Sequence, residues 1–126
     1  MKTAIQTSGA PQAIGPYSQA IRAGNLVFVS GQLPLDPAGK AMPEGVALQT
    51  EACLRNVAAI LAAAGLGMKD VVKTTVFMTD LGQFAVMNEV YAKSFPTPCP
   101  ARATVQAAAL PRGAAVEIEA VAVVGE

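Results

Sequence analysis

The sequence has 126 residues, of which 52% are hydrophobic and 14% charged, a composition that predicts one packed domain over residues 1–126 with surplus apolar surface that favours an oligomer. Nine Lys and Arg residues balance nine Asp and Glu residues, so electrostatics indicate neither a nucleic acid nor an anionic membrane as a partner. Histidine is absent, which excludes histidine-based triads and histidine metal sites, so acid–base chemistry must come from carboxylates, tyrosine, lysine or a thiol.

The first half of the chain predicts a hairpin, a loop and a helix. Gly24 and Asn25 form a turn signal between residues 18–23 and the apolar run 26–30, which favours two paired strands. Glycine and proline residues then indicate an exposed loop. Across residues 46–64 apolar side chains recur at helical spacing, and Gly65 follows where a left-handed cap is favoured.

The second half predicts a strand, a helix and two further strands. Residues 71–79 are β-branched and alternate, which indicates a strand. Asp80 is a plausible N-cap for a helix with an aromatic stripe that ends before Pro96. Residues 102–106 and 115–124 are the last strands, so the order β-β-α-β-α-β-β predicts an α+β or α/β sandwich with two helices on one face of the sheet.

The last two strands contain the residues best suited to chemistry. Alternation places Arg102 and Thr104 on one face of their strand and the apolar residues on the other, which we expect to face the core. Glu117 and Glu119 share a face of the final strand. If these strands pair as a hairpin, Arg102 stands near a glutamate with a hydroxyl between them.

Two interpretations of this patch stay open on residue types alone. The arginine fork can hold a small carboxylate in a bidentate manner, and a partly desolvated glutamate can act as a general base. The alternative is a structural Arg–Glu ion pair on a solvated face, which is the commoner arrangement.

Four other residues are candidates of weaker specificity. Tyr17 follows Gly15 and Pro16, so it is either a packing aromatic or a phenol that donates to a ligand. Ser30 and Gly31 read as a turn, or as a place where a backbone N–H approaches a ligand anion. Asn88 lies within the stripe of its helix and is either a satisfied core amide or a ligand contact.

The cysteine pattern and the apolar segments predict no metal site and no membrane span. Cys53 and Cys99 lie far apart, which excludes a C-x-x-C pair or a zinc quartet, and Cys53 is interpreted as a small core residue. Residues 1–4 lack the apolar core of a signal peptide, and no stretch approaches the ~20 apolar residues that span a bilayer. We expect a soluble, cytoplasmic protein.

Five stretches together resemble the RidA family, also called the YjgF or L-PSP family, over residues 14–124: "IGPYSQA", "VSGQLPLDP", "DVVKTTVFMTDLGQFAVMNEVYAKSF", "PARATV" and "LPRGAAVEIEAVAV". The resemblance implies a chorismate-mutase-like α+β fold that assembles as a homotrimer around a barrel-like core, with clefts between neighbouring subunits. It also implies hydrolysis of reactive 2-imino acids and their enamines, such as 2-iminobutanoate and 2-iminopropanoate, to 2-oxo acids and ammonia. Neither a metal nor an organic cofactor is implied, and the role is metabolite damage control.

The resemblance assigns roles to individual residues. It implies that Arg102 clamps the substrate carboxylate and that Glu117 activates the attacking water and manages the departing ammonia. The residues that complete the cleft, drawn from two subunits, would be Tyr17, Ser30, Gly31 and Asn88. The position two after the arginine is often cysteine in the family and is Thr104 here, which keeps a hydrogen-bonding atom for the substrate but removes the thiol. Because imine hydrolysis needs only water, we expect the activity to survive.

Two other functions stay open. RNA cleavage or translation inhibition is also attributed to the family, but it would favour a basic, aromatic-lined groove, whereas this chain is neutral and lacks tryptophan. The other is a trimeric ligand-binding or chaperone-like module without turnover, and Arg102 argues against it.

Overall fold

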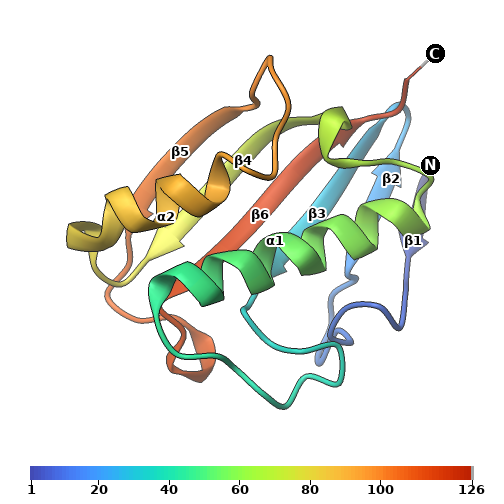
Figure 1. The fold of residues 1–126 in the computed structure, drawn as a ribbon. Coiled ribbons are helices and arrows are strands. Elements are labelled where there is room, and N and C mark those ends of the chain that lie inside the picture. The colour runs from blue at the N-terminus through green and yellow to red at the C-terminus, as the bar shows by residue number, and fades with distance from the viewer. Residues whose placement is uncertain (126) are drawn as a thin grey trace.

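The computed structural model describes residues 1–125, which form a six-stranded sheet and two α-helices. The strands are β1 (Lys2–Ile5), β2 (Ala20–Ala23), β3 (Leu26–Gln32), β4 (Val71–Met78), β5 (Ala101–Gln106) and β6 (Val116–Val123). The helices are α1 (Val46–Ala63) and α2 (Phe84–Tyr91), with 3₁₀ turns η1 (Met68–Asp70), η2 (Leu81–Gln83) and η3 (Pro111–Gly113). Both α-helices lie on one face of the sheet (Figure 1), so the predicted α+β class is confirmed.

The sheet is mixed, and its strand order is β1-β2-β3-β6-β4-β5. β4 and β5 are parallel and are connected through α2, whereas all other neighbours are antiparallel. The predicted hairpin of β2 and β3 is confirmed. The predicted pairing of the last two strands is wrong, because β4 lies between β5 and β6.

The core lies between the helices and the central strands. Along β6, four alternate side chains are at most 3% exposed and face the helices: Val116, Ile118, Ala120 and Ala122. α1 contributes Cys53, which is fully buried and whose thiol donates to the carbonyl oxygen of Val116 at 3.5 Å. Burial raises the pKa of this thiol. The prediction that Cys53 is a core residue is confirmed.

α1 has the length and apolar composition of a membrane-crossing helix, and half of that segment is buried. This is weak evidence for a span, since the core helix of a soluble protein passes the same test. Gly65 follows the helix at φ 77°, which is the left-handed conformation that glycine adopts readily and that the sequence predicted there.

α2 is shorter than the predicted helix and ends at Tyr91. The chain continues as a tighter turn, in which the N–H groups of Lys93 and Ser94 donate to the carbonyl oxygens of Val90 and Tyr91, three residues earlier. Asp80 accepts the backbone N–H of Gly82 and caps η2, the 3₁₀ turn that leads into α2. The N-cap of α2 itself is Gln83, so the prediction that Asp80 caps this helix is wrong.

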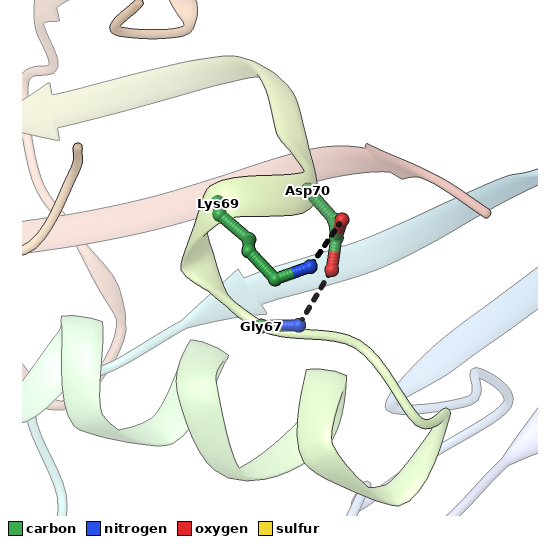
Figure 2. A network of polar contacts seen from close by, with 3 residues as sticks. All are labelled: Gly67, Lys69 and Asp70. Carbon is green, nitrogen blue, oxygen red and sulfur yellow. Dashed lines mark hydrogen bonds and ion pairs between the residues drawn. The ribbon is translucent and has the colours of Figure 1, made fainter. Parts of the chain in front are cut away.

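Two features near the chain surface complete the fold. β1 was not predicted, because its four residues, Lys-Thr-Ala-Ile, carry no turn signal or apolar alternation, and it is formed by pairing with the edge of β2. At η1, Asp70 accepts the N–H of Gly67 at 2.9 Å and pairs with Lys69 at 3.4 Å (Figure 2). This is the only ion pair within residues 1–125.

Candidate active site

Arg102 projects from β5 toward α2, on the face of the sheet that the helices cover. Its Nη1 donates a hydrogen bond of 2.7 Å to Oδ1 of Asn88. The guanidinium carbon lies 4.8 Å from the ring centroid of Tyr91 and 5.4 Å from that of Phe84, which are cation–π distances. Arg102 is in register with Thr74 of β4, so the two side chains lie on the same face of the sheet. Thr74 is buried under the helices, so Arg102 is on the core-facing side of β5. The prediction that the apolar face of β5 faces the core is therefore wrong.

The position of β5 explains this difference. β5 is an edge strand, and Val105 on its uncovered face is 41% exposed. The face that carries Arg102 packs under α2, where the long side chain of arginine covers aromatic surface while the guanidinium stays at the margin of the core. Alternation therefore grouped the side chains of β5 correctly but did not indicate which group the helices cover.

α2 builds the support for Arg102 on one face. Phe84, Asn88 and Tyr91 are spaced i, i+4 and i+7, which places them in one stripe. The Tyr91 hydroxyl and the Thr74 Oγ1 form a buried hydrogen bond of 2.7 Å, which fixes the ring beneath the guanidinium. Burial raises the pKa of the Tyr91 phenol, which therefore stays protonated at neutral pH. The sequence indicated the aromatic stripe but not that it would pack against Arg102.

Arg102 has no carboxylate partner within residues 1–125, because the ion pair of η1 is the only one there. The alternative of a structural Arg–Glu pair is therefore wrong for the single chain. A guanidinium has five N–H donors in a planar fork, and one hydrogen bond, to Asn88, is made here. The remaining donors leave the half-buried cation able to bind a small carboxylate.

Thr104 lies two residues beyond Arg102 on the same face, in register with the buried Val76. Its Oγ1 is buried and has no hydrogen-bond partner in the described part of the chain. An unpaired buried hydroxyl is uncommon, so it is a position where a ligand or water can be bound.

Glu117 lies on the uncovered face of the sheet, since its neighbours Val116 and Ile118 face the helices. Its side chain is half-buried, and burial, with a smaller contribution from the negative charge of Glu119, raises the pKa of the Glu117 carboxyl. The carboxylate packs against Gly31 of β3. A carboxyl with a raised pKa binds a proton more readily than an ordinary carboxyl, which suits a general base.

The β3 and Tyr17 candidates lie on the same side as Glu117. The Ser30 hydroxyl donates to the carbonyl oxygen of Ser18 at 2.6 Å, so its proton is already engaged. Tyr17 is 54% exposed, and together with Ser30 it lines a cavity of about 390 Å³ over the uncovered face. The sequence did not indicate Lys73 of β4, which also lines this cavity; alternation with the buried Thr74 could have placed it there.

The candidate residues thus form two groups. The helix-face group is Arg102, Asn88 and Thr104, and the open-face group is Glu117, Gly31, Ser30 and Tyr17. Because β4 lies between β5 and β6, Arg102 and Glu117 are two strands apart, about 10 Å across the sheet, as well as on opposite faces. One chain does not bring them together, and the patch that a hairpin would have made does not form.

Neither group has the composition of a metal site. Across residues 1–125 no three His, Cys, Asp or Glu side chains are grouped to hold a metal ion. The helix-face group instead contains a guanidinium, and the open-face group contains a half-buried carboxyl.

Comparisons with known proteins identify the family of the chain. The sequence model of the family described as Endoribonuclease L-PSP matches residues 7–124. The chain is 48% identical over 126 residues to 2-iminobutanoate/2-iminopropanoate deaminase of Mus musculus, covering 99% of this chain and 93% of that protein. It is 53% identical over 122 residues to Reactive Intermediate Deaminase A, chloroplastic, of Arabidopsis thaliana, covering 96% of this chain and 65% of that protein. The crystal structure of E. coli TdcF with bound serine superposes with a TM-score of 0.92 at 44% identity, covering 98% of this chain and 99% of that one. Sequence and fold together show that the chain belongs to the L-PSP family, the family also called RidA or YjgF.

Proposed function

We propose that this protein is an enzyme that hydrolyses reactive 2-imino acids and their enamine tautomers, such as 2-iminobutanoate and 2-iminopropanoate, to 2-oxo acids and ammonia. The names of the mouse and Arabidopsis relatives support this reaction. The observation that carries the proposal is the guanidinium of Arg102, which is supported by Asn88 and two aromatic rings and has no carboxylate partner within residues 1–125.

Arg102 binds the carboxylate of the substrate and so fixes C2. A planar guanidinium binds a carboxylate through two parallel hydrogen bonds, which set orientation as well as position. The serine bound to E. coli TdcF is itself a small amino acid with a carboxylate. Thr104 offers its unpaired Oγ1 next to the clamp, where the substrate nitrogen or a water can bind it.

Glu117 is the general base. The substrate reacts as the protonated imine. As the oxygen of water bonds to C2, Glu117 takes one water proton and the C=N π electrons pass to nitrogen, which becomes a neutral amine. Glu117 then returns this proton to the nitrogen, and the C–N bond breaks with its electrons leaving on ammonia. The remaining hydroxyl proton passes to the Glu117 carboxylate as the C2 carbonyl forms, and the released ammonia takes up that proton as ammonium, which restores the base. Each step needs a carboxyl group that changes protonation near neutral pH, and the raised pKa of Glu117 supports this role.

The complete site needs a second copy of the chain. Because the carboxylate and C2 of a 2-imino acid are joined by a single bond, the clamp and the base must lie within a few ångströms of the same small molecule. The distance between Arg102 and Glu117 in one chain excludes this, so we propose a homotrimer in which neighbouring subunits each contribute one group to a shared cleft. The exposed apolar side chains Phe28 and Val105 on the uncovered sheet face support such an assembly. A cytoplasmic location, supported by two free cysteines, completes the proposal.

The test is ammonia release from 2-imino acids generated in situ by an amino-acid oxidase. Arg102→Ala is expected to lower kcat/KM about 10²- to 10³-fold, the loss associated with removing a buried charged hydrogen-bonding partner. Arg22→Ala is the matched control, because within residues 1–125 the Arg22 side chain bonds only to the carbonyl oxygen of Gly24 in its own turn, and we expect this variant to keep full activity. Full activity in Arg102→Ala would refute the clamp. Binding of 2-oxo acids without any ammonia release by the unmodified protein would instead indicate a ligand-binding module.

A further inference from the structure

Gly31 lies at an irregularity of the sheet, directly against Glu117. The β3–β6 register passes from Val29 with Ala120 to Gln32 with Ile118, which is three residues along β3 against two along β6. β3 therefore contains a bulge at positions 30 and 31, and bulges re-aim side chains and backbone locally. Hydrogen bonds of Ser30 to the preceding loop hold the bulge in place.

The Glu117 carboxyl occupies the space that a side chain at position 31 would fill. A Cβ built on Gly31 would lie 2.5 Å from Oε2 of Glu117 and 3.1 Å from its Cδ, and real Cβ atoms essentially never approach other atoms within 3.0 Å. The backbone of Gly31 does not have a positive φ, so any residue could adopt its conformation. A side chain at position 31 would therefore push the Glu117 carboxyl out of its place, because that carboxyl is the end of a flexible side chain and can move.

The Glu117 carboxyl is not held by hydrogen bonds in the described chain. Within residues 1–125 neither oxygen of Glu117 accepts a hydrogen bond. On the β4 side, Phe77 is the residue in register with Glu117 and shares its face of the sheet. Glu117 is therefore flanked by Phe77 on one neighbouring strand and by the bare backbone of Gly31 on the other.

We propose that Gly31 is a positioning residue for the reaction, because its missing side chain creates the recess that holds the Glu117 carboxylate where it can take a proton from the attacking water. This inference rests on the proposed function. It differs from the substrate contact that the sequence predicted for Gly31, because the glycine acts here through Glu117.

The first experiment is Gly31→Ala, assayed by ammonia release and by calorimetric binding of 2-oxobutanoate. We expect kcat to fall about 10²-fold, since a displacement near 1 Å of a catalytic group has an effect of that size. We expect the affinity for 2-oxobutanoate to stay within about twofold, because the Arg102 clamp is untouched. Gly67→Ala is the matched control: Gly67 has φ −132° and no atom within 4 Å of a built Cβ, so both measurements should remain at the wild-type values.

A double-mutant cycle with Glu117→Ala separates this role from general damage. Glu117→Ala removes both the base and the side chain that would clash with a methyl group at position 31. In the Glu117→Ala background, Gly31→Ala should therefore cause no further loss of activity and should no longer lower the melting temperature. Additive losses would overturn the inference, as would a loss of 2-oxobutanoate affinity equal to the loss of kcat/KM. The melting-temperature coupling applies even if Gly31→Ala alone folds poorly.

The outcomes also separate this inference from the proposed function. If Glu117→Ala is fully active, the base assignment is wrong and the role of Gly31 fails with it. If Glu117→Ala is inactive while Gly31→Ala has wild-type kcat, only the role of Gly31 is wrong.

Discussion

Mixing two inactive variants tests whether each site is shared between chains. Arg102→Ala removes the clamp, and Glu117→Gln removes the base while keeping the shape of the side chain. In one chain these residues lie on opposite faces, two strands apart, or about 10 Å across the sheet. A site that needs both must take them from different copies, so a mixed assembly contains some sites with both residues intact.

The recovered activity follows from counting chains. In a closed ring of identical subunits each site has one neighbour that supplies Arg102 and another that supplies Glu117. With equal amounts of the two variants and random assembly, half of the clamp positions and half of the base positions are intact. Independent occupancy then predicts about a quarter of the wild-type activity per site. The assay is ammonia release after co-refolding of the two chains, with each variant alone as the baseline.

The control is a mixture in which no site can be complete. Arg102→Ala combined with the Arg102→Ala/Glu117→Gln double variant provides no intact clamp, so its activity should equal the baseline. Mass spectrometry of differently tagged chains confirms that mixed assemblies have formed. If mixed assemblies have formed and the mixture of the two single variants, Arg102→Ala with Glu117→Gln, still has only baseline activity, the sharing of sites between subunits is refuted.

Two further predictions concern single residues. Asn88→Ala removes the acceptor of the 2.7 Å bond from Arg102 and is expected to lower kcat/KM about 10- to 100-fold, the effect of a lost bond to a charged group. Asn88→Asp keeps an acceptor but adds a negative charge that competes with the substrate carboxylate for Arg102, so we expect a higher KM than for Asn88→Ala. Equal KM values in the two variants would contradict the binding of the substrate carboxylate by Arg102. Because burial raises the pKa of folded Glu117, the folded state holds this proton more tightly than the unfolded state, and its contribution to stability is lost as pH rises through the folded pKa. Glu117→Gln is therefore expected to raise the free energy of unfolding near pH 7 relative to wild type, a difference that narrows as pH falls; denaturant titrations that show a constant difference would contradict this.

Local patterns predicted most elements, because their signals lie within the element itself. The apolar period of α1 and the alternation of β4 depend only on which face is buried. The partner of β6 depended on the whole sheet. β6 is buried on its helix face and has half-buried valines, Val121 and Val123, on the other, which suits a central strand better than one arm of a terminal hairpin. The predicted hairpin rested on the short connection between β5 and β6. Giving more weight to the apolar character of β6 would have favoured a central position for this strand, as observed.

The site was predictable as a set of residues but not as an arrangement. The motifs indicated Arg102, Asn88 and Glu117, and alternation correctly separated Arg102 from its apolar neighbours. A helix covers one face of the edge strand β5, and the choice of face depends on packing between distant segments, here the stripe of α2. The alternation of residues within β5 does not indicate this choice. The close fit of Glu117 on Gly31 depends on a bulge, which a single sequence indicates only as a glycine beside a serine.

The separation of Arg102 and Glu117 has a consequence for reactivity. An arginine and a glutamate on one face of neighbouring strands would pair with each other, and the pair would neutralise the clamp and lower the pKa of the base. β4 prevents this contact within the chain, so Arg102 keeps unused donors and the Glu117 carboxyl keeps a raised pKa. On the proposed function, the substrate carboxylate occupies the guanidinium in the assembled cleft, and this leaves Glu117 free to act on water. The fold therefore keeps the two charges apart until a ligand lies between them.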